Sequence, residues 1–398
     1  MQKQKNGVMG AALLLAGTAI GSGMISLPMV LARFGIIGTC AIMLAFSVLI
    51  YLTAIIRADI NLNTNNAASS LREAGNMLGT PFIGSLGDAM LKLLAFALMT
   101  AYMTGGASII NSLIGHSMSP ILSLCFVTTL VAAIFFFASD SIVRINKVLF
   151  SGLFTMLISL MAILCWQTPI KVIPQQLDSV TLNEWATLIP VIFTSFGFHT
   201  VTHIVAKLCN SDRALVRKAC LIGTAIPTVV YICWTVAILL VVANTDSAFF
   251  SLMLEGKATE VGELVRVLSN AASSEKIQTV VWIVSALAIL TSILGVGFSL
   301  WDSVRREWKA PKLLSVVVVA VLPAIVSVVT PNAFITVLNV AGSILSIVAI
   351  ISPVIISMKM QSHGNLQCEP LLKNKAVLLS VLAAGIGIIV LGAIDLLA

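Results

Sequence analysis

Long apolar runs separated by short polar segments make up most of this sequence. Most runs reach the roughly 20 residues that an α-helix needs to cross a bilayer. The pattern therefore predicts an all-α polytopic membrane protein with eleven transmembrane helices. The predicted spans are 8–32, 34–57, 86–115, 119–138, 142–166, 187–207, 219–244, 276–303, 312–329, 332–358 and 375–397.

Composition agrees with this class. Hydrophobic residues make up 59% of the 398 residues and charged residues only 10%, whereas a soluble domain carries roughly 25% charged residues. We expect a single transmembrane domain over residues 1–398, in contact with membrane lipid. The net charge of +7 comes from basic loops and does not indicate a nucleic-acid partner. The seven cysteines are scattered singly, so no metal site is expected, and no cofactor.

The basic residues predict an orientation. If the N-terminus is cytoplasmic, 18 Lys and Arg residues fall on that side and 5 on the other. This bias agrees with the positive-inside rule. An odd number of spans then places the C-terminus in the periplasm.

Glycines interrupt the first predicted span. Gly17, Gly21 and Gly23 lie in its middle, where each costs up to ~1 kcal/mol relative to alanine. Unwound backbone persists in lipid only where it is buried or lines a cavity. The pair Gly17 and Gly21 also suits simple helix packing. If the interruption is a ligand site instead, the candidate substrate-binding residues are Ala19, Ile20, Gly21, Ser22 and Gly23.

A second interruption is predicted in the sixth span, where polar residues cluster between 194 and 203. The two interrupted spans, the first and the sixth, are five positions apart, so the two helices cross in opposite directions, as in inverted-repeat transporters. The repeats would cover about 8–166 and 187–358, with an extra helix at about 375–397. Half-helix ends suit a zwitterion such as an amino acid. The candidate substrate-binding residues here are Thr194, Ser195, Phe196, Gly197 and Phe198.

Four further residues are candidates within the spans. Tyr102 lies in the third span and is either a packed aromatic or a cavity residue. Thr291 and Ser292 either coordinate Na⁺ or bond to their own helix carbonyls. His199 is the mid-membrane group that titrates near neutral pH. It is therefore the first candidate for carrying a coupled proton, unless it is a neutral histidine that holds the broken helix.

No enzymatic activity is expected. Ser195 and His199 lie four residues apart on one helical face, which leaves an intramembrane hydrolase as an alternative. Such an enzyme also needs an oxyanion site and an activated serine. A passive channel would need a charged ring or a filter motif, and the sequence shows neither.

Three segments carry a resemblance to a known family. They are Gly-Thr-Ala-Ile-Gly-Ser-Gly-Met-Ile-Ser-Leu-Pro at 17–28, Thr-Ser-Phe-Gly-Phe-His at 194–199 and Thr-Ser-Ile-Leu-Gly-Val-Gly-Phe-Ser-Leu-Trp-Asp at 291–302. The chain resembles the bacterial hydroxy/aromatic amino acid permeases, whose members are specific for tyrosine or tryptophan. The resemblance implies the LeuT-like five-plus-five inverted-repeat fold of the amino acid–polyamine–organocation superfamily, with helices 1 and 6 discontinuous.

The same resemblance implies a function and residue roles. It implies proton-coupled import of an aromatic amino acid across the inner membrane, with tyrosine first, then tryptophan or phenylalanine. The substrate carboxylate would meet the backbone at Ala19–Gly23. Its amino group would meet carbonyls there and at Phe196–Phe198. Thr291 and Ser292 match a sodium position of related transporters.

One segment departs from the family pattern. The family continues after the histidine of the sixth span with a glycine and a proline, whereas this chain has Thr-Val-Thr-His at 200–203. Substrate choice and coupling therefore stay open. The alternative is a symporter for a small neutral amino acid, with Na⁺ coupling possible.

Overall fold

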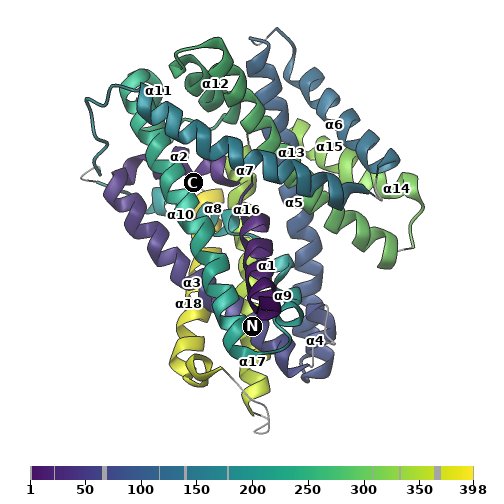
Figure 1. The fold of residues 1–398 in the computed structure, drawn as a ribbon. Helices are drawn as coiled ribbons and strands as arrows, with labels where there is room; N and C mark the ends of the chain where they lie inside the picture. The colour runs from purple at the N-terminus through teal and green to yellow at the C-terminus, as the bar shows by residue number, and fades with distance from the viewer. Residues whose placement is uncertain are drawn as a thin grey trace.

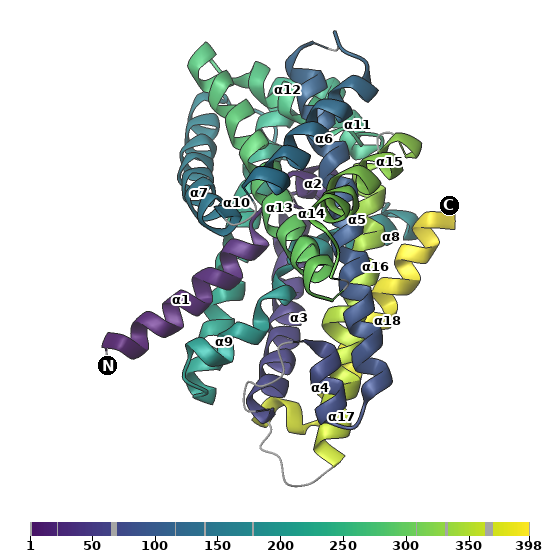
Figure 2. The ribbon, with the colours of Figure 1, turned by 90° about the vertical axis from the view of Figure 1, so that its right-hand side faces the viewer.

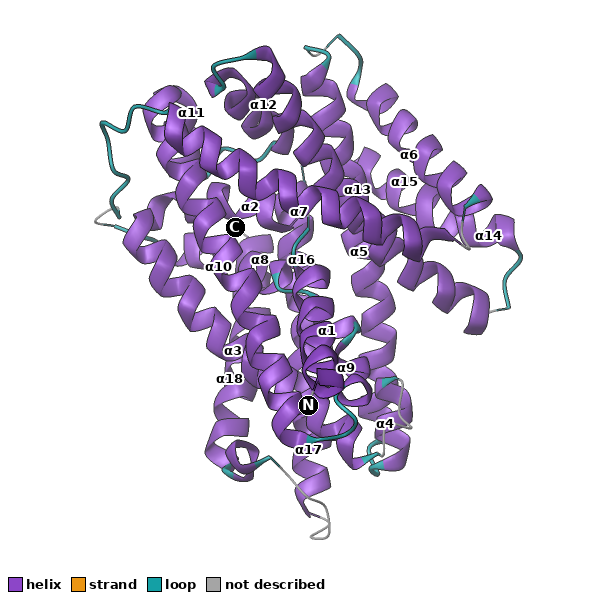
Figure 3. Ribbon diagram, viewed as in Figure 1, coloured by secondary structure: helices purple, strands orange, loops and turns teal. Residues whose placement is uncertain are grey.

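Helices joined by short loops account for the fold (Figure 3). The computed structural model describes residues 2–21, 23–64, 70–115, 117–138, 141–176, 179–307, 309–330, 333–362 and 369–397. No strand occurs within these ranges. The predicted all-α class is therefore confirmed. It suits a lipid environment, because helices satisfy their own backbone N–H and C=O groups with hydrogen bonds.

The first half of the chain ends with three long helices. Within it, the short helix α4 begins with a capping box, in which Ser70 and Glu73 each bond to the other's backbone N–H. The elements are α1 (Gln2–Ala19), α2 (Gly23–Leu31), the 3₁₀ turn η1 (Ala32–Phe34), α3 (Gly35–Asn63), α4 (Leu71–Met77), α5 (Pro81–Leu113), α6 (Pro120–Phe137) and α7 (Ile142–Gln167).

The second half repeats the alternation of short and long helices. It comprises α8 (Leu182–Ser195), the 3₁₀ turn η3 (Phe198–Thr200), α9 (Thr202–Leu208), α10 (Arg213–Thr245), α11 (Ser247–Leu254), α12 (Val261–Ala271), α13 (Glu275–Glu307), α14 (Lys312–Val316), the π-helical η4 (Val317–Val321), α15 (Leu322–Val329), α16 (Phe334–Ser346), the π-helical η5 (Ile347–Ile351), α17 (Ser352–Ser362), η6 (Pro370–Lys373) and α18 (Lys375–Leu397).

The chain is a multi-pass membrane protein. Nine helices of the described ranges are long and apolar enough to cross a membrane. The predicted first span is divided into α1 and α2, and the predicted sixth span into α8 and α9. Both predicted discontinuities are therefore present. The total of eleven crossings is not confirmed and stays a prediction.

The short helices gather at two opposite ends of the bundle (Figure 1). We call the end at α4, α9 and α17 the inner end, and the end at α2, α11 and α12 the outer end, after the predicted orientation. Figure 2 shows the N-terminal part of α1 leaning away from the bundle near the inner end. Its neighbours in the bundle are mainly α10 and α9.

Arg33 joins three segments at the outer end. Its guanidinium pairs with Glu184 at the start of α8 and donates to the carbonyl of Leu254 at the end of α11. Next to it, the rings of Phe34 and Trp185 meet edge to face, with centroids 4.6 Å apart. The outer halves of the two broken helices are thus held together.

Candidate functional site

A cavity of about 490 Å³ lies between the two helix interruptions. This volume falls in the roughly 300–1,000 Å³ range of small-molecule sites. Ten of the fourteen residues singled out from the sequence line it. They are Ala19, Ile20, Gly21, Gly23, Tyr102, Thr194, Ser195, Gly197, Thr291 and Ser292. Ser22, which the sequence also singles out, lies outside the described residues.

Close approach of neighbouring elements explains the glycines of the first interruption. A Cβ atom on Gly21 would collide with the Ser292 hydroxyl of α13, and one on Gly23 would lie 3.0 Å from the Cα of Ser195. A Cβ on Gly17 would lie 3.2 Å from the Phe150 ring. The glycines therefore serve packing and also line the cavity, so the two interpretations of this motif are compatible.

The second interruption has a different construction. After α8 ends at Ser195, the N–H of Gly197 bonds to the carbonyl of Thr194 at 3.0 Å, and the chain enters the turn η3. A Cβ on Gly197 would meet only that same carbonyl, at 3.0 Å. This interruption is closed by local turns, and other parts of the molecule leave space around its glycine.

Tyr231 of α10 connects the two interruptions. Its hydroxyl lies 2.7 Å from the carbonyl oxygen of Ala19 and 2.6 Å from that of Ser195. These carbonyls are at the ends of α1 and α8, where the helix provides no partner. One turn further along α10, the Trp234 Nε1–H donates to the carbonyl of Met24 at 3.0 Å.

Sequence reasoning missed both α10 residues. Tyr231 and Trp234 are buried, and in an apolar helix they read as ordinary core aromatics. The available signal was their spacing and chemistry. Tyr231 and Trp234 are three residues apart, on one face of the helix, and each carries a polar group that needs a partner when it is buried.

The dipoles of the interrupted helices give the cavity two electrostatic characters. Ala19 and Ser195 end helices and present carbonyl oxygens, while Gly23 begins α2 and presents N–H groups. Helix C-termini attract positive charge and N-termini attract negative charge. A ligand carrying both an ammonium and a carboxylate group matches this arrangement.

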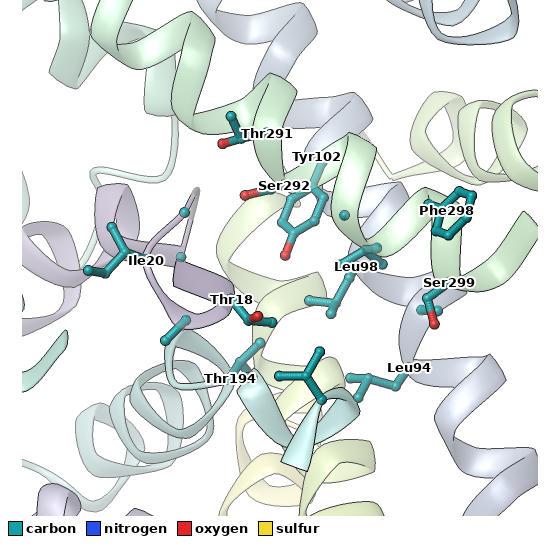
Figure 4. Close-up of a pocket in the computed structure, with 18 of the residues that line it drawn as sticks. Thr18, Ile20, Leu94, Leu98, Tyr102, Thr194, Thr291, Ser292, Phe298 and Ser299 are labelled. Atoms are coloured by element: carbon teal, nitrogen blue, oxygen red, sulfur yellow. The ribbon is translucent and has the colours of Figure 1, made fainter. Parts of the chain in front are cut away.

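Polar and apolar side chains complete the wall (Figure 4). In this view the hydroxyl of Tyr102, on α5, points into the cavity. Thr291 and Ser292 donate to Leu287 and Ala288 of their own helix, at 2.8 and 2.9 Å, which is the alternative to ion coordination. The apolar part of the wall comprises Leu91, Leu94, Leu98, Phe150, Val296, Phe298 and Leu338.

Three singled-out residues lie away from this cavity. The Phe196 ring packs against Tyr231 with centroids 5.0 Å apart, and the Phe198 ring stacks on His199 at 4.9 Å. His199 Nε2 lies 2.8 Å from the Thr53 hydroxyl of α3. The Ser195 hydroxyl bonds instead to the carbonyl of Val191, at 2.9 Å. The turn between Ser195 and His199 also means that the two side chains do not share the helical face that a hydrolase would use.

His199 lines a second cavity of about 540 Å³ at the inner end. Leu91, Ala95, Ser299 and Asp302 line both cavities, so the two are contiguous. Ion pairs mark the wall of the second cavity. Asp88 lies 3.5 Å from Arg72 and 3.2 Å from Lys92, which also pairs with Glu307 at 2.6 Å.

Comparisons with known proteins identify a family and a fold that this chain resembles. The model of the tryptophan/tyrosine permease family matches residues 4–392. The tyrosine-specific transport system 1 of Haemophilus influenzae is 27% identical over 373 residues, which cover 91% of this chain and 90% of the relative. The glutamine transporter 2 of Aliivibrio fischeri is 27% identical over 358 residues, covering 86% and 87%.

Among solved structures, the crystal structure of MhsT in complex with L-phenylalanine is similar in fold. The TM-score is 0.65 over 97% of this chain and 98% of that chain, at 15% sequence identity. The likeness confirms the predicted LeuT-like fold.

Proposed function

Because this chain belongs to the tryptophan/tyrosine permease family, we propose that it imports an aromatic amino acid by proton symport across the bacterial inner membrane. Tyrosine is the first candidate substrate, followed by tryptophan and phenylalanine. The observation that carries the proposal is the cavity between two interrupted helices, whose polar backbone ends face an apolar wall.

The backbone of the interruptions would hold the substrate's head group. The N–H groups at the start of α2, around Gly21 and Gly23, suit a carboxylate. Carbonyls at Ala19–Gly23 and in the stretch Phe196–Phe198 suit the ammonium group. Within that second stretch, Gly197 is the residue that lines the cavity. Ser292 occupies the space that a side chain on Gly21 would need, and both residues line the cavity.

The apolar wall favours an aromatic side chain. Leu94, Leu98, Phe150 and Phe298 line the cavity together with Tyr102. Burying an aromatic side chain among such groups stabilises the bound state by roughly 1.5–3 kcal/mol. The remaining singled-out polar residues, Thr194 and Ser195, would border the head group.

His199 would carry the coupled proton. The Thr53 hydroxyl lies 2.8 Å from both the Ile50 carbonyl oxygen and His199 Nε2. We assign its hydrogen to the carbonyl, so that the hydroxyl accepts from Nε2–H. The other ring nitrogen, Nδ1, then has a free lone pair, and it has no hydrogen-bond partner within the described ranges. Sodium at Thr291 and Ser292 is the alternative coupling ion.

A glutamine-like substrate is the second candidate. The relative named glutamine transporter 2 motivates it, and so does Asn146, which lines the cavity. Its Oδ1 atom is buried without a hydrogen-bond partner in the described part of the chain. This oxygen could accept a hydrogen bond from a substrate amide, or from a tyrosine hydroxyl.

Uptake measurements separate these possibilities. Radiolabelled tyrosine, tryptophan, phenylalanine and glutamine are offered to cells that lack their own permeases for these amino acids, and all twenty amino acids are then tested as competitors. We expect accumulation of tyrosine that a proton uncoupler removes. Accumulation of none of the four, with no effect of the uncoupler, would refute the proposal. Dependence on external Na⁺ would replace the proton with sodium.

We also propose a cytoplasmic N-terminus and a periplasmic C-terminus, from the bias of 18 to 5 basic residues. Alkaline phosphatase fused after α18 should be active, since this enzyme needs the periplasm to fold. An inactive, intact fusion would reverse the assignment or change the number of crossings.

A further inference from the structure

Arg57, near the inner end of α3, is a buried cation that the proposed central site does not use. Its exposed fraction is 6%, and it lines the second cavity. Its Nη1 atom has no hydrogen-bond partner among the described residues. The other two cations of this cavity, Arg72 and Lys92, are paired with Asp88 and Glu307. Asp88 attracts Arg57 electrostatically, but this carboxylate already pairs with Arg72 and Lys92. The buried Nη1 donor is therefore left for a further acceptor.

His199 presents the opposite kind of group to the same cavity. It is 7% exposed, and its Nδ1 atom also lacks a partner in the described part of the molecule. With the proton assigned to Nε2, where Thr53 accepts it, the neutral ring offers Nδ1 as a hydrogen-bond acceptor.

The two groups lie close together because of α3. Thr53 and Arg57 are four residues apart in this helix, so they lie on one face, one turn from each other. Thr53 holds His199 through the bond to Nε2. The second cavity thus combines a guanidinium N–H donor and a ring-nitrogen acceptor that both lack hydrogen-bond partners among the described residues, which is the complement of a carboxylate next to an ammonium group.

We propose that the second cavity is an inner binding station for the head group of an α-amino acid. Arg57 binds the carboxylate through its fork of N–H donors, and His199 Nδ1 accepts a hydrogen bond from the ammonium group. This inference rests on the proposed function, because the ligand is the transported amino acid on its way from the contiguous central cavity. A proton carried on Nδ1 must leave before the ammonium group binds there.

The test measures transport from each face of the membrane. The full-length protein is reconstituted in vesicles, and tyrosine, tryptophan or glutamine is added to the outer or the inner face. The measured value is the amino-acid concentration that half-saturates exchange from that face. We expect Arg57→Gln to raise the inner-face value by about tenfold or more, since a charge-assisted hydrogen bond is lost. The outer-face value should change much less, and Arg57→Lys should recover part of the loss.

Arg72→Gln is the matched control. Arg72 lines the same cavity, but its side chain is 48% exposed and is already paired with Asp88. We expect a change below about threefold on either face, because exposed ion pairs contribute little. Arg57→Gln should also be as thermally stable as the parent protein, since it removes a buried charge whose Nη1 atom makes no hydrogen bond within the described residues. A folded Arg57→Gln protein with an unchanged inner-face value would overturn the station and leave the proposed function intact.

Equilibrium binding decides the case if the protein transports none of the three amino acids, which would refute the proposed function. Labelled glycine and acetate are then offered to the purified full-length protein. Glycine binding that Arg57→Gln removes, with weaker binding of acetate, supports a zwitterion station. Acetate that binds as tightly as glycine indicates a simple carboxylate site and contradicts the station, as does binding that is independent of Arg57.

Discussion

The two helix interruptions face one cavity but are built in different ways. The first is closed sterically, because Gly21 and Gly23 touch α13 and α8 so closely that a Cβ atom has no space. The second is closed by turns, and its glycine, Gly197, has room around it. Side-chain hydrogen bonds reach both interruptions, but only the first also has close glycine contacts. The second relies on hydrogen bonds such as the one between His199 and Thr53.

This difference predicts that one interruption is rigid and the other can change its conformation. A main chain held by the absence of side chains has one position, since nothing but glycine fits there. A main chain held by hydrogen bonds can move when a partner or a proton changes. We therefore expect the first interruption to fix the position of the substrate, and the second to respond to coupling. Substitutions at each site test this contrast.

The largest effect is expected at the first interruption. Gly21→Leu should abolish transport while the protein still inserts into the membrane, because the side chain collides with Ser292 and fills the cavity. Uptake is measured against the amount of protein in the membrane fraction. The control is Gly10→Leu in α1, where a Cβ atom meets nothing within 4 Å. Uptake by Gly21→Leu equal to that of the control would assign Gly21 to packing alone.

Loss of the link between the interruptions should come next. Tyr231→Phe removes the hydroxyl that serves Ala19 and Ser195, and unsatisfied buried groups cost about 1–3 kcal/mol. We expect the substrate affinity to fall about tenfold, measured by equilibrium binding to purified protein. Tyr51→Phe in α3 is the control. Equal affinities in the two variants would make Tyr231 only a packing residue.

His199→Gln should change coupling more than binding. A glutamine amide can still donate to the Thr53 hydroxyl, but it cannot take up a proton. We expect uptake that no longer responds to an imposed pH gradient, with substrate binding retained. The measurement is uptake into vesicles with and without the gradient. An unchanged response to the gradient would leave His199 with a structural role.

The smallest effect is expected from Gly197→Ala. The added methyl group meets only the Thr194 carbonyl, and the backbone φ of −65° is ordinary for alanine. We expect uptake to fall by less than about threefold, in line with the roughly 1 kcal/mol scale of compatible glycine substitutions. Gly21→Ala, measured in parallel, should be clearly worse. Equal losses would remove the contrast between the two interruptions.

The sequence was sufficient to locate both interruptions, because glycines such as Gly21 and polar residues such as Thr194 are local anomalies in apolar runs. The role of Tyr231 could not be inferred in this way. Its partner Ala19 is 212 residues away, and only the folded chain brings the two together. The sequence also could not indicate which way the His199 side chain points, since the turn at η3 changes the direction of the chain after Ser195. For Ser292, the sequence left two alternatives that depend on contacts in three dimensions.

Arg33 gives the outer end a tie that depends little on its surroundings. It joins α8 and α11 through Glu184 and Leu254, and the two charged side chains are 20% and 19% exposed. Because most of each side chain is covered, ions in the adjacent solution screen this pair much less than an exposed one. On the predicted orientation this solution is continuous with the medium around the cell. The tie should then keep most of its strength when the salinity of that medium rises.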